Sequence, residues 1–182
     1  ERAANLISSF KRVAADQTSG EMREFDVVEC FKDTILSLEP KLNPSHISVE
    51  IHGGEGLRIN NSPGSLSQVA TNLILNATLH AYPEGAGGKI DIWITVTPQK
   101  EVEIRFQDSG RGIHKDQTKR IFEPFVTSLR AKGGTGLGLS IVYNIITRNF
   151  SGTVECQSDL GKGATFIIRF PLEQAVESTT PA

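Results

Sequence analysis

Apolar residues recur along the chain with two periods, which divide it into predicted helices and strands. Spacing of i, i+3, i+4 and i+7 is typical of a helix with one buried face. This spacing predicts helices over residues 1–19, 30–42, 63–81 and 137–149. Ser62 and Pro63 supply the N-cap and the first-turn proline of the third helix, and Asn43-Pro44 ends the second.

Alternation of apolar and polar residues predicts strands in the remaining segments. The predicted strands are residues 25–28, 47–51, 57–59, 89–97, 102–108, 152–157 and 164–170. We expect the second and third to pair through the turn 53–56, and the last two to form a hairpin. Residues 109–135 are irregular apart from one helical turn near 117–122. Because strands and helices do not alternate regularly, we predict an α+β sandwich, one mixed sheet with about three helices on one face.

Composition and charge narrow the classes of function. The 182 residues are 38% apolar and 22% charged, as in an ordinary globular protein. A net charge of −2 gives no reason to expect nucleic acid or an anionic membrane as a partner. No stretch approaches the ~20 apolar residues of a membrane span. Cys30 and Cys156 have neither metal-ligand spacing nor a disulfide framework, which favours reduced thiols and a cytoplasmic location.

A glycine-rich run before the last predicted helix is the first candidate for chemistry. The run 132–140 places four glycines within six residues, from 133 to 138. Such a loop directs backbone N–H groups and the positive end of a helix dipole at one point, which suits a phosphate. The run is not a P-loop, because the chain contains no G-x-x-x-x-G-K-[ST], and it lacks the last glycine of G-x-G-x-x-G.

A polar stripe runs along the predicted helix 63–81. Four residues recur at every fourth position and therefore lie on nearly one side: Gln68, Asn72, Asn76 and His80. Mg²⁺ binds oxygen ligands such as asparagine carbonyls and completes its octahedron with phosphates. The competing interpretation, a solvated helix face, fits poorly because asparagine is a weak helix former and two copies in mid-helix cost stability.

Asp108 ends the predicted strand 102–108 on the same side as three apolar residues, so it should point inward. A buried carboxylate needs a hydrogen-bond donor. The exocyclic amine of adenine is such a donor, whereas guanine presents a carbonyl that the carboxylate would repel. The glycines of the following segment 109–112 leave room for a flat base. The alternative is a plain Asp-Ser-Gly turn, and it is the favoured interpretation when Asp108 is considered without the other motifs.

The segment 120–125 carries two aromatic residues in charged surroundings. It is a candidate for docking a lid over a ligand. A short amphipathic turn is the alternative.

In combination these motifs resemble those of the catalytic ATP-binding domain of bacterial sensor histidine kinases, in the GHKL superfamily. The resemblance rests on residues 72–77 (N box), 108–113 (G1 box), 121–125 (F box), 134–140 (G2 box) and 161–166 (last glycine motif). It covers about residues 22–171. Each box is weak alone, but five in this order at these spacings are specific.

The resemblance implies a Bergerat fold that binds ATP and Mg²⁺ under a lid formed by residues 114–135. In this picture Asn76 ligates Mg²⁺ with Asn72 assisting, and Asp108 binds the adenine amine. The other implied nucleotide contacts are Gly110 and Gly112 beside the base, Gly134, Thr135, Gly136, Leu137 and Gly138 around the phosphates, His80 beside the nucleotide, and Lys132 with Arg130 from the lid. For these two lid cations a solvated loop is an equal alternative. Phe122 and Phe125 would fasten the lid.

One position departs from the family pattern. Ala164 stands where the family often has threonine or serine, so a hydroxyl near the base is lost. We expect ATP binding to survive with a slightly weaker or water-bridged adenine contact.

The resemblance also implies partners and a division of the chain. Residues 1–20 resemble the end of the second helix of a dimerisation and phosphoacceptor hairpin, and residues 22–171 resemble the catalytic domain. The polar composition of residues 172–182 predicts a flexible tail. The expected reaction transfers the ATP γ-phosphate to a histidine on a hairpin missing from this chain, for relay to an aspartate of a response regulator. The parent protein would dimerise through that hairpin. It would be free or membrane-anchored, whereas this domain is expected to be cytoplasmic, without nucleic acid or direct membrane contact.

Two other functions remain as alternatives. An ATP hydrolase of the same superfamily would have a glutamate four residues before the metal-binding asparagine, as the general base for water. Asn72 holds that position and cannot take a proton. A nucleotide-sensing module with a degenerate site ranks last, because every motif is filled.

Overall fold

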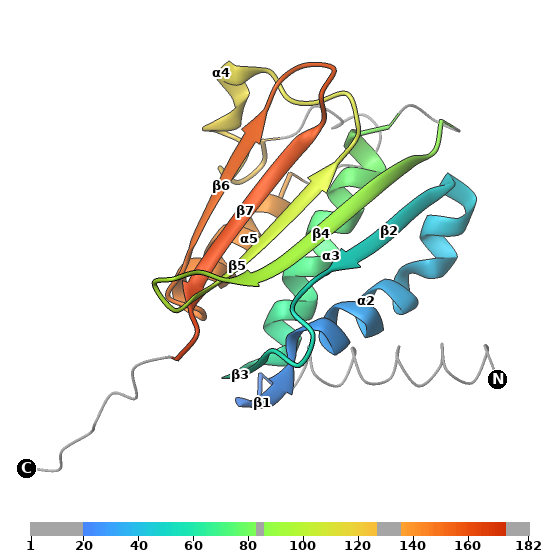
Figure 1. Cartoon of the computed structure of the whole chain (residues 1–182). Helices are drawn as coiled ribbons and strands as arrows, with labels where there is room; N and C mark the ends of the chain where they lie inside the picture. Colours follow the sequence, from blue (N-terminus) through green and yellow to red (C-terminus); the bar gives the residue numbers. More distant parts are fainter. Residues whose placement is uncertain (1–19, 83–85, 127–135, 174–182) are drawn as a thin grey trace, which may run out of the picture.

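The protein folds into two layers, a sheet and the helices that cover one of its faces (Figure 1). The computed structural model describes residues 20–82, 86–126 and 136–173. The elements are β1 (Arg23–Asp26), α2 (Val27–Leu42), η1 (Asn43–Ser45), β2 (Ile47–His52), β3 (Arg58–Asn61), α3 (Pro63–His80), β4 (Gly88–Val96), β5 (Glu101–Asp108), α4 (Lys115–Thr118), α5 (Gly138–Arg148), β6 (Thr153–Ser158) and β7 (Ala164–Pro171). The predicted helix 1–19 lies outside the described residues. None of the described helices is long and apolar enough to cross a membrane.

Five strands form the main sheet, in the order β2-β4-β5-β7-β6. The β2–β4 pair is parallel and the other three pairs are antiparallel. The helices α2, α3 and α5 lie across one face of this sheet (Figure 1). The α+β sandwich and the β6–β7 hairpin are therefore confirmed.

The predicted pairing of the segments 47–51 and 57–59 is wrong, and a small ribbon accompanies the mixed sheet. β3 pairs with β1 in a separate two-stranded ribbon, and β2 instead lies parallel to β4. The glycine turn after β2 carries the chain away from it, with Gly53, Gly54 and Gly56 all at positive φ. A side chain at Gly54 would collide with Ile94 at the end of β4, so glycine lets the turn pack closely there.

Helix α2 begins at Val27, three residues before the predicted start, and replaces the second half of the predicted strand 25–28. Asp26 caps this helix, because its side chain accepts a hydrogen bond from the Glu29 backbone N–H at 3.0 Å. Helix α3 has the predicted start, with Pro63 in its first turn and the Ser62 hydroxyl accepting from the Ser65 backbone N–H at 3.2 Å.

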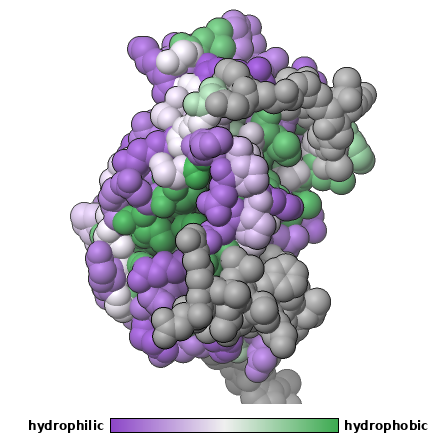
Figure 2. All heavy atoms as spheres, turned by 90° about the vertical axis from the view of Figure 1, so that its right-hand side faces the viewer, coloured by the Kyte–Doolittle hydropathy of each residue, from purple (hydrophilic) through white to green (hydrophobic). Residues whose placement is uncertain are grey.

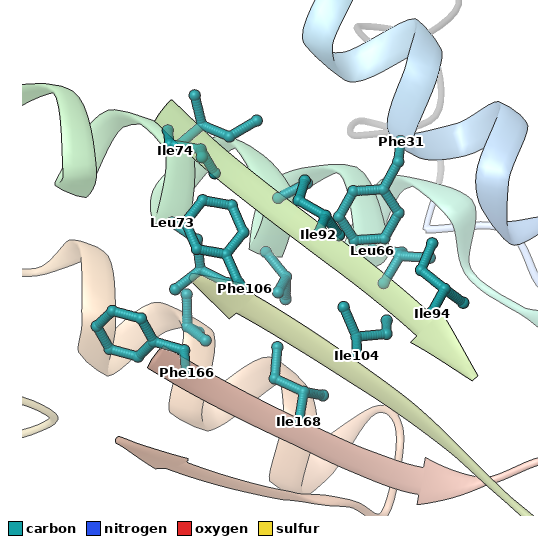
Figure 3. Close-up of a cluster of buried hydrophobic side chains, with 14 of the residues drawn as sticks. Phe31, Leu66, Leu73, Ile74, Ile92, Ile94, Ile104, Phe106, Phe166 and Ile168 are labelled. Atoms are coloured by element: carbon teal, nitrogen blue, oxygen red, sulfur yellow. The ribbon is translucent and has the colours of Figure 1, made fainter. Parts of the chain in front are cut away.

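The core lies between the helices and the inner face of the sheet (Figure 3). Its fully buried side chains include Phe31, Leu66, Leu73, Ile74, Ile92, Ile94, Ile104, Phe106, Phe166 and Ile168. Truncating one buried phenylalanine in such a core typically costs about 3–5 kcal/mol. Every second residue of β5 enters this core, and the last one to do so is Asp108, as predicted.

The β2 edge of the sandwich carries apolar side chains that are only partly buried. Figure 2 shows hydrophobic atoms among polar ones on this side of the molecule. Ile35 on α2 and Val49 and Ile51 on β2 pack against the core while remaining partly exposed. The sheet thus ends at β2 in a border of partly buried side chains.

Candidate nucleotide site

The polar stripe of α3 is not a freely solvated face. Asn72, Asn76 and His80 are each half-buried, and only Gln68 at the beginning of the stripe is exposed. Helix α5 packs beside α3, and a side chain added at Gly138 would come 3.5 Å from Asn72 Oδ1. The structure therefore brings the N-box helix and the end of the glycine-rich run together.

Asp108 is 4% exposed, at the inner end of β5. Its Oδ1 accepts hydrogen bonds from the backbone N–H groups of Gly110 at 2.9 Å and Ala164 at 3.3 Å. Burial raises the pKa of this carboxyl, and the two N–H groups offset only part of the increase. The Gly110 bond is the Asp-Ser-Gly turn considered as the alternative. The second bond, to another strand, and the burial go beyond a plain turn, and Oδ2 has no hydrogen bond among the described residues.

The loop that follows Asp108 locks onto the end of α3. The Arg111 backbone N–H donates to the Ala81 carbonyl oxygen at 2.8 Å. A side chain at Gly110 would collide with Ala81, so only glycine allows this approach. Burial, with a smaller effect of the nearby Arg111 charge, lowers the pKa of His80, which favours its neutral form at pH 7. The Asp108 loop is thus held against the C-terminal end of the helix that carries the stripe.

Ser158 joins the same loop to the β6–β7 turn, and sequence reasoning missed it. Its hydroxyl accepts from the Ile113 backbone N–H at 2.8 Å and donates to the Gly163 carbonyl oxygen at 2.7 Å. Ala164 lies between Asp108 and Ser158 in the strand register. Residue 164 lacks the hydroxyl that the family often has there, but the Ser158 hydroxyl on the neighbouring strand β6 holds the two loops together. Its position at the inward-facing end of β6 was the available signal.

The two aromatic residues of the F box have different roles. Phe122 packs against Tyr143 and Phe166, with ring centroids 6.0 and 6.3 Å apart, so it fastens the segment to the core as expected. Phe125 is 63% exposed, and here the backbone does the fastening, because its N–H donates to the Gly136 carbonyl oxygen at 2.9 Å. Helix α4 begins at Lys115, two residues before the predicted turn.

Several predicted contacts lie outside the described residues, namely Arg130, Lys132, Gly134 and Thr135. Of the G2 contacts, Gly136, Leu137 and Gly138 are described, and all three are partly buried. Gly136 has a positive φ of 67°, and a side chain there would come 2.6 Å from the Phe125 backbone. Gly112, at φ 72°, likewise sits against the backbone of Asp159.

The arrangement combines three chemical functions along one side of α3. Asn72 and Asn76 are half-buried residues whose amide oxygens suit a hard divalent cation. Asp108 offers a buried carboxylate oxygen to a donor, and the beginning of α5 offers backbone N–H groups. A ligand with an amine-bearing base, phosphates and a bound cation matches this order of groups.

A family comparison and searches of curated proteins and solved structures agree on one class of protein. Residues 61–174 match the model of the family described as histidine kinase-, DNA gyrase B-, and HSP90-like ATPase. Sporulation kinase E of Bacillus subtilis is 33% identical over 97% of this chain and 23% of its own length. Sensor kinase CckA of Brucella abortus is 34% identical over 93% of this chain and 19% of its own. The chain therefore spans about a fifth to a quarter of these relatives.

Solved structures give the same result. The catalytic domain of histidine kinase ThkA superposes with a TM-score of 0.73 and 30% identity, covering 84% of this chain and 97% of that one. ThkA in complex with the response regulator protein TrrA matches with a TM-score of 0.69 and 26% identity, over 93% of this chain and 49% of that one.

Proposed function

We propose a phosphotransfer function from the premise that the chain belongs to the family of histidine kinase-, DNA gyrase B- and HSP90-like ATPases. Within that family it is the catalytic ATP-binding domain of a sensor histidine kinase. The proposed reaction moves the γ-phosphate of ATP to a histidine on a helical hairpin of the parent protein, and then to an aspartate of a response regulator. The ThkA complex with a response regulator supports this partner class.

The buried carboxylate of Asp108 is the observation that carries the nucleotide assignment. One of its oxygens is held by two backbone N–H groups, and the other is left to accept from the adenine amine. Asn76, with Asn72 assisting, would hold Mg²⁺, which screens the charge of the phosphates when bound. Gly136 to Gly138, at the beginning of α5, would contact the phosphates. His80, neutral and half-buried, would lie beside the nucleotide.

The rest of the proposal concerns the whole parent protein. We infer that residues 1–20 continue into the dimerisation and phosphoacceptor hairpin, that 22–171 form the catalytic domain and that 172–182 form a tail. Phosphoryl transfer asks little covalent chemistry of this domain, because the acceptor imidazole is the nucleophile. The domain positions the phosphate and stabilises its charge. Asn72, where a hydrolase would have a glutamate, argues against water as the acceptor.

Calorimetric titration of the chain with ATP in Mg²⁺ buffer tests the nucleotide site. Asn76→Ala should weaken binding at least tenfold, because the amide ligand is lost while alanine preserves the helix. Gln68→Ala is the matched control, since Gln68 lies on the same stripe but is exposed. The ATP affinity of this variant should be unchanged. If Asn76→Ala bound ATP as tightly as the unmodified chain, the proposal that Asn76 ligates Mg²⁺ would be wrong.

Labelling with γ-³²P-ATP separates the kinase from the hydrolase. A longer polypeptide that includes the complete hairpin should label itself, and the label should be acid-labile and base-stable, as a phosphohistidine is. Steady release of inorganic phosphate without a phosphoprotein would instead support the hydrolase.

A further inference from the structure

The sheet face that the helices leave uncovered carries a compact group of metal-ligand side chains. Glu50 and His52 lie on β2. Asp91 lies on the neighbouring strand β4, where it is the register partner of Glu50. One donor atom from each lies within 4.8 Å of the other two. Ile90 and Ile92, on either side of Asp91, are buried in the core, so Asp91 points away from the helices. The group is therefore on the face opposite the core and the nucleotide site.

A cation already lies where these carboxylates meet. The ammonium of Lys89 is 2.9 Å from Glu50 Oε2 and 3.1 Å from Asp91 Oδ1. His52 Nε2 is 2.6 Å from the same oxygen of Asp91. Asp91 Oδ1 thus contacts both an ammonium and an imidazole nitrogen, in an arrangement that already holds positive charge.

Trp93 restrains the imidazole of this group. Its ring stacks on that of His52, with centroids 5.0 Å apart and planes inclined by 22°. The stack limits the rotation of His52, so less side-chain entropy is lost when its nitrogen binds a ligand. Trp93 is also the chain's one tryptophan.

We propose that Glu50, His52 and Asp91 form a surface site for a divalent transition metal of the zinc class. One imidazole nitrogen and two carboxylate oxygens suit Zn²⁺ and Ni²⁺, whereas Mg²⁺ and Ca²⁺ prefer oxygen ligands only. The metal replaces the ammonium of Lys89, whose side chain is 45% exposed and can turn into solvent. Lys89 is therefore a built-in competitor that sets a threshold for metal binding.

Trp93 provides a direct readout, because paramagnetic Ni²⁺ bound beside a tryptophan quenches its fluorescence. Titration of the nucleotide-free chain with NiCl₂ should give saturable quenching at one equivalent, reversed by ZnCl₂ and absent with MgCl₂. Asp91→Asn keeps the ring stack and should weaken the Ni²⁺ affinity at least tenfold. Lys89→Met should strengthen it about threefold or more, because the competing ammonium is gone.

The controls separate this site from other histidines. His114→Ala removes an exposed imidazole beside Asp116 and should leave the titration unchanged. Quenching that does not saturate, or that Asp91→Asn leaves intact, would overturn the proposal. So would weaker binding by Lys89→Met, because the ammonium would then be part of the structure of the site rather than a competitor. Zinc calorimetry of His52→Ala, in which the ring stack is lost, should show no binding at this site.

Discussion

Replacing the buried carboxylate by an amide, Asp108→Asn, tests the base-recognition hypothesis most directly. The amide oxygen can still accept from the Gly110 and Ala164 N–H groups, so the local fold is retained. The second oxygen becomes an NH₂ group, which faces the adenine amine as donor against donor. A hydrogen bond to a charged group is worth about 1.5–3 kcal/mol. At 1.4 kcal/mol per factor of ten, ATP should bind about 10- to 150-fold more weakly.

Calorimetric titration with ATP and with ITP gives two independent readouts of this substitution. ITP carries a 6-oxo group, to which the new amide can donate, so the preference for ATP over ITP should fall by a similar factor. Asp116→Asn is the matched control, because its carboxylate is 88% exposed on α4. An ATP affinity within threefold of the parent, in a variant whose thermal midpoint is not lowered, would refute the assignment of Asp108 to the base.

The pH dependence follows from the raised pKa of Asp108, which burial causes. In the folded state the ionised form is penalised, so the cost to stability is present above the folded pKa and disappears as pH falls below it. Asp108→Asn should therefore melt at or above the parent temperature at pH 7. This advantage should shrink as pH falls from the raised pKa of the folded state towards the ordinary pKa of a carboxyl group. ATP affinity of the parent should fall over the same range, because protonation removes the acceptor.

Three further predictions concern the surroundings of the site. Ser158→Ala leaves the Ile113 N–H and the Gly163 carbonyl without their partner, and urea unfolding should show a loss of about 1–3 kcal/mol together with weaker ATP binding. Gly110→Ala brings a methyl group within 2.5 Å of the Ala81 carbonyl oxygen and should cost a similar amount; an unchanged urea midpoint would contradict the close approach. Burial raises the pKa of the Cys156 thiol from 9.0 to about 12, so alkylation at pH 8 should be about a thousandfold slower than in the urea-unfolded chain, as mass spectrometry can measure.

Local patterns predicted the parts of the fold that depend on local physics. Alternation along β5 was enough to place Asp108 inside, and the Ser62-Pro63 pair was enough to begin α3. The pairing of β3 with β1 was not predictable in this way. It depends on which distant strand the chain meets after the glycine turn, and two short strands joined by a turn favour a hairpin on local grounds alone.

The same distinction applies to the candidate site. Asn72, Asn76 and His80 could be grouped by helical spacing, and the structure brings them into one half-buried stripe. Alternation along β6 could show that Ser158 points inward, but not that it bridges two loops, because their contact exists only in the folded chain. The grouping of charged residues around Asp91 could not be predicted either. It depends on the parallel pairing of β2 with β4, which local patterns did not indicate.

The bond between the Phe125 N–H and the Gly136 carbonyl oxygen has a consequence for how this protein can vary. This bond fixes the distance between the two residues that flank the segment 126–135, and the entropy cost of closing the segment then depends on its length. For a flexible loop, doubling the length adds only about 0.6 kcal/mol to the closure cost. Insertions and deletions between these two residues should therefore be tolerated by the fold. The fold therefore places little constraint on how many residues separate Phe125 from Gly136.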